Sequence, residues 1–156
     1  MFKVAVLICW MVLVRGAEPA SSAVTSVTRT HVLRLRPGAD LVDSIRAYAS
    51  AKHIRAAMVS TIVGSLNSAK IRYADQSGYT ALDGKFEIVS AVGMIDPAGG
   101  HLHLSVSDGS GKTLGGHVGS GCIVYTTAEI VLTELPDLTF TREKDKDSGY
   151  NELVVR

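Results

Sequence analysis

Residues Gly99–Gly121, GGHLHLSVSDGSGKTLGGHVGSG, contain the pattern that decides the fold. From His101 to Ser107 polar and apolar residues alternate, with the two-residue period of a strand that has one covered face. The glycine-rich segment Asp108–Gly111 is typical of a turn between antiparallel strands. The stretch therefore predicts a β-hairpin, and we expect its second strand over residues 117–125.

The hairpin would bring three histidines together. His101 and His103 share one side of their strand, because alternate residues point the same way, and lie about 7 Å apart along it. The turn returns His117 toward this pair. Three neutral imidazoles suit Zn²⁺ or another borderline divalent cation and leave a fourth position for water or substrate. The three residues are the candidate metal ligands, but the spacing equally fits histidines that are only polar surface residues.

The rest of the chain shows the same β-type patterns. Gly or Asp stands in most of the gaps between strands, and the short spacings favour antiparallel hairpins over parallel crossovers. Gly64 is expected to end one of the strands. The predicted strands cover residues 31–36, 58–63, 69–74, 86–95, 101–107, 117–125, 129–134, 138–142 and 150–155.

One segment shows helical periodicity instead. Asp40 is a suitable N-cap, and apolar residues recur at helical spacing from Leu41 to Ala49 in a helix expected to reach Lys52. We therefore predict a single α+β domain, with a large, mostly antiparallel β-sheet and one or two helices packed on it.

Composition narrows the function classes. The chain has 156 residues, of which 46% are hydrophobic and 20% charged. These proportions are those of an ordinary globular domain and exclude collagen, a disordered chain and a multi-pass membrane protein. The formal net charge is +1, so no overall positive field would attract a nucleic acid.

Residues 1–16 have the layout of a secretory signal peptide, because a basic start precedes eleven apolar residues and then small ones. Eleven residues are too short for a stable membrane anchor. The expected organisation is a signal peptide (1–16), a flexible linker (17–30) and one domain (31–156), in a secreted or secretory-lumen protein. A buried first strand or a misassigned start is the alternative, and the protein would then be intracellular. Cleavage would leave Cys122 as the one thiol, which we interpret as a small buried residue.

Several segments, in order along the chain, carry a family resemblance. They are RPG at 36–38, GSL at 64–66, GKFEIVS at 84–90, GGHLHLS at 99–105, GGHV at 115–118, TRE at 141–143 and GY at 149–150. Through them the chain resembles the PPC domain, the "plants and prokaryotes conserved" domain, in its stand-alone form. The resemblance implies a sandwich-like subunit that assembles as a homotrimer, and a metal site at the positions of His101, His103 and His117.

The plant members of that family carry an AT-hook, an Arg-Gly-Arg-Pro core with basic flanks, and this motif does not occur in the present sequence. DNA binding therefore does not follow from the resemblance.

The expected function is a homotrimeric module that binds a divalent metal, zinc for example, or a small ligand through the three histidines. One alternative is a metal-dependent enzyme, of hydrolytic type for example, in which Glu87 or Asp108 would move a proton. Another is DNA binding by family analogy, with Arg34, Arg36 and Arg72 as the available cations.

Overall fold

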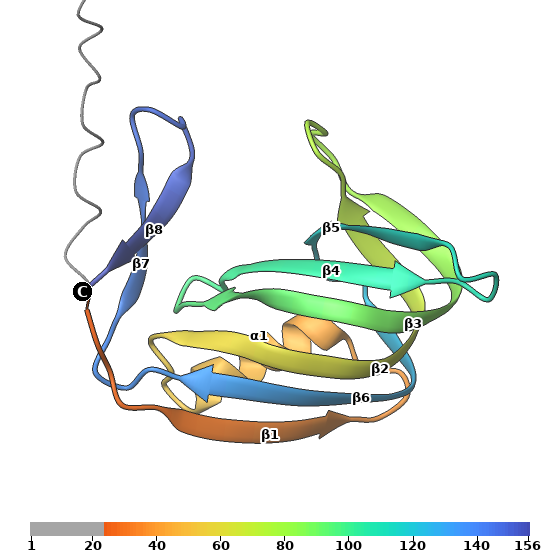
Figure 1. Cartoon of the computed structure of the whole chain (residues 1–156), viewed down its shortest axis with the longest axis horizontal. Coiled ribbons are helices and arrows are strands. Elements are labelled where there is room, and N and C mark those ends of the chain that lie inside the picture. The colour runs from red at the N-terminus through yellow and green to blue at the C-terminus, as the bar shows by residue number, and fades with distance from the viewer. Residues whose placement is uncertain (1–23) are drawn as a thin grey trace, which may run out of the picture.

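The computed structural model describes residues 24–156, so the predicted signal peptide and the first part of the linker lie outside the described residues. Six strands form one antiparallel sheet in the order β1-β6-β2-β3-β4-β5, and β7 and β8 form a separate hairpin (Figure 1). This arrangement confirms the predicted α+β class. The elements are β1 (Arg29–Leu35), α1 (Leu41–Ala51), β2 (Ala57–Arg72), β3 (Thr80–Ile95), β4 (His101–Ser107), β5 (Thr113–Val118), β6 (Ile123–Glu134), β7 (Phe140–Lys144) and β8 (Asn151–Val155).

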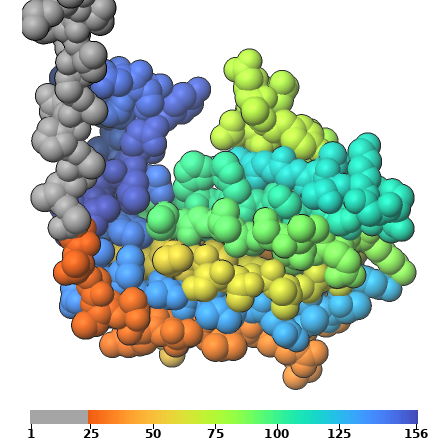
Figure 2. All heavy atoms as spheres, viewed as in Figure 1, coloured from red at the N-terminus to blue at the C-terminus, as the bar shows by residue number. Residues whose placement is uncertain are grey.

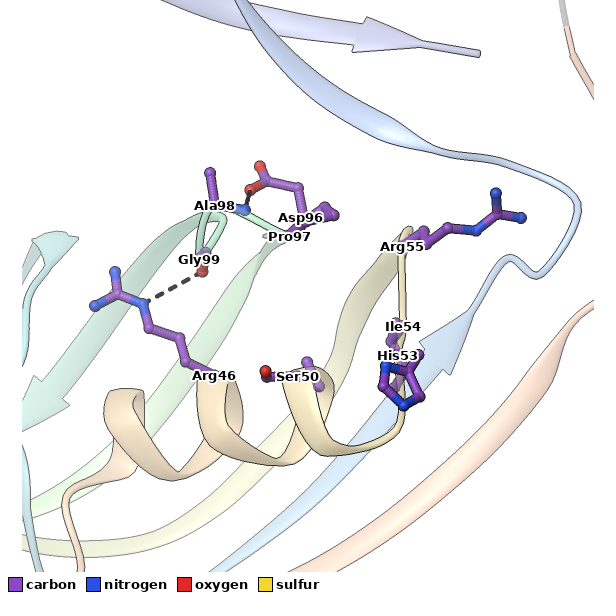
Figure 3. A pocket seen from close by; sticks show the side chains of 10 residues that line it. Arg46, Ser50, His53, Ile54, Arg55, Asp96, Pro97, Ala98 and Gly99 are labelled. Carbon is purple, nitrogen blue, oxygen red and sulfur yellow. Dashed lines mark hydrogen bonds between the residues drawn. The ribbon is translucent and has the colours of Figure 1, made fainter.

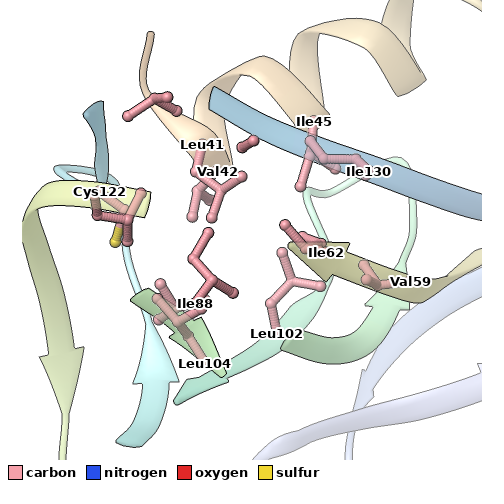
Figure 4. Packing of buried hydrophobic residues seen from close by; sticks show 14 of the residues in the cluster. Leu41, Val42, Ile45, Val59, Ile62, Ile88, Leu102, Leu104, Cys122 and Ile130 are labelled. Carbon is pink, nitrogen blue, oxygen red and sulfur yellow. The ribbon is translucent and has the colours of Figure 1, made fainter. Parts of the chain in front are cut away.

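Helix α1 covers one face of the sheet. The Asp40 side chain caps it by accepting a hydrogen bond from the Asp43 amide, as the sequence predicts. Leu41, Val42 and Ile45 are each at most 2% exposed and pack on buried side chains of the strands (Figure 4). Each fully buried aliphatic side chain contributes about 1.5–3 kcal/mol, so this contact fixes which face of the sheet stays open.

The sheet rolls up at one end. The last residues of β2, Ile71 and Arg72, pair with Val118 and His117 of β5, although β5 also pairs with β4 along its length. Ile71 and Val118 are buried inside this curled end. The curl therefore places the end of β2 beside the strand that carries His117.

Gly64 does not end a strand, contrary to the prediction. Strand β2 runs through it, and the register with β6 shifts between Gly64 and Leu66. The glycine has φ +139°, and a Cβ built there would lie 2.1 Å from the Thr127 carbonyl oxygen. Gly64 thus allows β6 to approach β2 closely, so it marks an irregularity within a strand.

Two other strand predictions have wrong limits. Strand β3 begins at Thr80, and the expected strand 117–125 is two strands, β5 and β6, with an intervening connection. In that connection the Gly119 amide donates to the Lys70 carbonyl and the Gly121 amide donates to the Asp40 carboxylate. These bonds to β2 and to the start of α1 turn the chain away from the hairpin before β6 begins.

The β7–β8 hairpin stands away from the sheet at the side where β3 meets β4 (Figures 1 and 2). An ion pair links it to the body: Arg142 Nε on β7 lies 2.9 Å from Asp96 Oδ2, and the Asp96 side chain is only 1% exposed. At the other end of the chain, β1 begins at Arg29, within the predicted linker. Within residues 24–156, no helix has both the length and the apolar character needed to cross a bilayer.

Candidate metal centre

Alternation along β4 separates its residues between the two faces of the sheet. Leu102 and Leu104 are buried in the core that α1 covers (Figure 4). His101 and His103 therefore lie on the opposite, open face, as the two-residue period predicts.

Strand register brings the third histidine to this pair. His103 lies directly opposite His117 across β4 and β5, and His117 lies directly opposite Arg72 across β5 and β2. Residues directly opposite in an antiparallel pair have their Cβ atoms about 4.5–5.5 Å apart. His103, His117 and Arg72 thus form one row across three strands, with His101 in the neighbouring row.

The three rings converge on one point. One nitrogen of each ring lies within 4.8 Å of a nitrogen of the other two, and the Nε2 atoms of His101 and His103 are 3.1 Å apart. The ring centroids of His101 and His117 are 4.9 Å apart, and those of His103 and His117 are 5.7 Å apart. In a tetrahedral zinc site the ligand nitrogens are about 3.3 Å apart, as follows from Zn–N distances of about 2.0–2.1 Å. The 3.1 Å between His101 and His103 is close to this value, and the other nitrogen separations are within 4.8 Å.

Burial and neighbouring cations lower the pKa of two of the three rings, His101 and His117. Desolvation, followed by the charges of His101, Arg72 and the other nearby cations, lowers the pKa of His117 to about 4. Desolvation and the neighbouring His103 and Arg142 also lower the pKa of His101. Neutral imidazoles have free nitrogen lone pairs at neutral pH, which is the state that binds a metal ion.

One ring nitrogen gives an independent indication of a ligand. His117 Nδ1 is buried and has no hydrogen-bond partner among residues 24–156. An unsatisfied buried polar atom costs about 1–3 kcal/mol, so a ligand that reached this nitrogen would recover that cost. A donor set made only of imidazole nitrogens fits zinc or a similar borderline cation better than calcium or magnesium.

A glycine allows the strands to meet at this site. A Cβ on Gly116 would lie 2.6 Å from the Arg72 carbonyl oxygen and 2.9 Å from the Ile71 side chain. Gly116 therefore serves the close approach of β5 to β2, whereas Gly115 approaches Leu104 and Ser105 of β4.

The histidines form part of the wall of a cavity of about 680 Å³ that lies between the curled sheet and the β7–β8 hairpin. Figure 2 shows the molecule hollowed between this hairpin and the segment that joins β2 to β3. Four charged residues also line this cavity: Arg72 from β2, Asp96 from the loop after β3, Arg142 from β7 and Glu152 from β8. Glu152 also lines a smaller cavity on the other side of the pair His101 and His103.

A second cavity, of about 560 Å³, lies between the C-terminal half of α1 and the loop that joins β3 to β4 (Figure 3). Arg46 of α1 donates a hydrogen bond to the Gly99 carbonyl oxygen at its edge. This cavity shares Asp96 and Ala98 with the first one. The loop at residues 96–100 therefore lies between the cavity lined by His101 and His117 and a second cavity lined by His53.

Comparison with known families decides what kind of domain this is. The sequence profile of the Plants and Prokaryotes Conserved (PCC) domain, also abbreviated PPC, matches residues 22–136. The chain belongs to the PCC domain family. The resemblance inferred from the glycine and histidine motifs is thereby confirmed.

Curated relatives carry the PCC domain within longer proteins. The bifunctional protein GlmU of Synechococcus sp. strain JA-2-3B'a(2-13) is 43% identical over 82% of this chain, but the match covers 20% of GlmU. The AT-hook motif nuclear-localized protein 29 of Arabidopsis thaliana is 27% identical over 80% of this chain and 46% of its own length. The chain thus spans less than half of either relative.

Three solved structures have a fold similar to that of this chain. A hypothetical protein from Salmonella enterica is 43% identical, with a TM-score of 0.83 over 85% of this chain and 96% of that one. A metal-containing protein from Archaeoglobus fulgidus is 28% identical, with a TM-score of 0.69 over 81% of this chain and 93% of that one. A plant- and prokaryote-conserved protein from Pyrococcus horikoshii is 27% identical, with a TM-score of 0.70 over 85% of this chain and 97% of that one.

Two carboxylates considered from the sequence lie away from the histidines of this PCC domain. Asp108 is five residues beyond His103, about 16 Å along an extended chain, and caps its own turn by accepting from the Ser110 and Lys112 amides. Glu87 pairs with Ser107, next to Asp108. Two carboxylates line the cavities beside the histidines: Asp96, which pairs with Arg142, and Glu152, which no local spacing links to the histidines because it comes from β8.

Proposed function

We propose that this PCC domain binds one divalent metal ion, zinc, through the imidazoles of His101, His103 and His117. The convergence of the three imidazole rings carries the proposal, together with the buried His117 Nδ1 that has no hydrogen-bond partner among residues 24–156. A bound zinc ion would supply a Lewis acid at the wall of the adjoining cavity. The similarity to a protein described as metal-containing, that of Archaeoglobus fulgidus, supports the same proposal.

We also propose that the subunit assembles with copies of itself as a homotrimer, which is the assembly that the family resemblance implies. The open face of the sheet supports self-association, because it carries apolar side chains that α1 does not cover. Met58 and Met94 lie opposite one another there, and Val92 lies opposite His103. The exposed fractions of these three side chains are 39%, 38% and 57%, respectively. A face of this kind is typical of a protein interface.

Metal content and thermal unfolding test the metal proposal together. We expect one zinc per chain after reconstitution and dialysis. At a free zinc concentration 100 times the Kd, mass action adds about 2.7 kcal/mol, which for a chain of this size raises the Tm by roughly 5–10 °C. His103→Ala should lose both the zinc and the rise in Tm, whereas His53→Ala, outside the cluster, should keep both.

Two results would overturn the proposal. One is wild-type protein that retains much less than one zinc per chain under these conditions. The other is a His103→Ala variant whose Tm rises with zinc as much as that of the wild type.

A metal-dependent enzyme is the second candidate, favoured by the cavity that adjoins the histidines and contains Glu152. A carboxylate in that position can accept a proton from a bound molecule. The zinc-loaded protein should then hydrolyse some member of a panel of esters, amides and phosphoesters, with turnover lost in His103→Ala and reduced in Glu152→Gln. Turnover equal in the wild type and His103→Ala would exclude this site as its source, and an inactive panel would count against catalysis.

DNA binding is not part of the proposed function. Arg34 on β1 donates to the Thr127 hydroxyl. It pairs with Glu129 of β6, which in turn pairs with Val63, in the middle of β2. Arg72 lies at the far end of β2, beside His117. The arginines that the sequence offers for a nucleic acid are thus separated along the strand and do not form one basic surface.

A further inference from the structure

The cavity between the histidines and the β7–β8 hairpin has the size of a small-molecule site. Its volume of about 680 Å³ falls within the range of roughly 300–1,000 Å³ that is usual for such sites. His101 and His117 form part of its wall, so a molecule within it can reach the point on which the rings converge. Tyr150 and Asn151 from the hairpin line the opposite side.

The charges around this cavity do not balance once a cation is bound. Arg142 is neutralised by Asp96, at 2.9 Å, and the two form an internal pair. Arg72 makes no ion pair within residues 24–156, and its guanidinium donates to the Gln76 carbonyl oxygen at 3.3 Å. Glu152 offsets that single charge. A divalent cation on neutral histidines therefore leaves an excess of two positive charges, which an anion in the cavity would compensate.

The free donors at this site suit a carboxylate better than a phosphate. Phosphate sites commonly use several backbone amides of a glycine-rich loop. Here the Ala98 and Gly100 amides of the loop at 96–100 already donate to Asp96 Oδ1, and the Gly99 amide donates to the Asp96 carbonyl oxygen. What remains is the Arg72 guanidinium, whose planar fork can pair with the two oxygens of a carboxylate, and the side chains of Tyr150 and Asn151, which also line the cavity.

We propose that this cavity binds a small organic carboxylate, held between the Arg72 guanidinium and the metal ion at the three histidines. The inference rests on the proposed metal site and adds the chemical class of the ligand. Arg72 is placed for this role by the strand register, because it lies directly opposite His117. The β7–β8 hairpin supplies the outer wall and is held there by the ion pair of Arg142 with Asp96.

Cobalt-substituted protein tests the two proposals separately. Co²⁺ at nitrogen ligands gives visible absorption bands that change when another ligand joins the ion. We expect these bands in the wild type, and a saturable change on addition of succinate or acetate but not of the neutral acetamide. Arg72→Gln should retain the bands and bind succinate at least about tenfold more weakly, because one charge-assisted contact is lost. Arg72→Lys should recover part of the affinity, and Arg34→Gln on β1 should match the wild type.

The outcomes separate a failure of the metal site from a failure of the carboxylate site. Absence of cobalt bands would overturn both proposals. Bands that succinate and acetate leave unchanged would overturn the carboxylate proposal alone, as would a response to inorganic phosphate only. Equal succinate affinity in the wild type and Arg72→Gln would show that any bound anion contacts the ion without Arg72, contrary to the proposal.

Discussion

At the scale of single residues, the histidine cluster destabilises the folded protein when no ligand is bound. It brings three titratable rings together, next to Arg72 and Arg142, and leaves His117 Nδ1 buried without a partner within the described chain. Side chains selected only for stability would not be arranged in this way. A cation bound by the rings would offset part of this cost, because bonds to the metal compensate for the desolvation of the ring nitrogens.

The low pKa of His117 predicts how the metal-free protein responds to acid. Its folded-state pKa, about 4, lies below the ordinary value of 6.5. Between these pH values the unfolded chain binds a proton at this position that the folded chain does not. The free energy of unfolding should therefore fall as pH decreases from about 6.5 toward 4. Urea unfolding with a chelator present, across this pH range, measures the slope.

Other groups also titrate in this range, so variants identify the contribution of His117. In His117→Gln the slope should be smaller than in the wild type, while His53→Gln should retain the wild-type slope. An identical slope in wild type and His117→Gln would contradict the assignment.

Cys122 illustrates the opposite case, a group that burial makes inert. Its side chain is 0% exposed, and desolvation raises the pKa of its thiol from 9.0 to about 11. Since the thiolate is the reactive form, a thiol reagent at pH 8 should not label the folded protein. The measurement uses a Cys9→Ser variant, so that Cys122 is the one thiol, with and without denaturant. Rapid labelling of the folded variant would show that the thiol is accessible.

At the scale of elements, β2 depends on a glycine at the position where β6 crosses it. Gly64→Ala would place a Cβ 2.1 Å from a backbone oxygen in a residue with φ +139°. We expect a loss of roughly 2–4 kcal/mol in the free energy of unfolding, because backbone atoms cannot move aside as a side chain can. Gly38→Ala is the matched control: φ is +85°, but nothing lies within 4 Å, so only about 1 kcal/mol should be lost. Equal losses in the two variants would contradict the steric explanation.

The local patterns predicted what depends on local geometry. Alternation placed His101 and His103 on one face, and the turn at residues 108–111 returned the chain so that His117 lies opposite His103. Period and turn chemistry are sufficient for these relations. The same patterns misjudged Gly64, because a glycine that ends a strand and a glycine that permits a close strand crossing have the same local sequence signal.

The residues around the histidines could not be found in this way. Arg72 reaches His117 through the pairing of β2 with β5, across more than forty residues of chain. Glu152 and Arg142 reach the cavity because a buried ion pair holds a separate hairpin in place. Each relation results from tertiary closure, which no spacing within the sequence records.

At the scale of the whole molecule, the two faces of the sheet have different roles. The face under α1 forms the core. The open face carries the histidines together with exposed apolar residues on the neighbouring strands β3 and β2. A copy that buries this open face would therefore lie next to the proposed metal site. Assembly would then restrict ligand access to the site, even though one subunit supplies all three histidines.

A substitution on the open face, away from the histidines, can therefore test the proposed trimer without removing a metal ligand. Met58 lies on the open face, opposite Met94, and a charge there would have to be buried in any interface that covers the face. We expect the wild type to sediment as a trimer at micromolar concentration and Met58→Glu to sediment as a smaller species. Val155→Glu, which adds the same charge on the hairpin, should remain a trimer.

Because His101, His103 and His117 belong to one chain, the dissociated Met58→Glu subunit should still bind zinc. A monomeric wild type would exclude the trimer, and a folded Met58→Glu monomer without zinc affinity would show that a neighbouring copy is needed to complete the site.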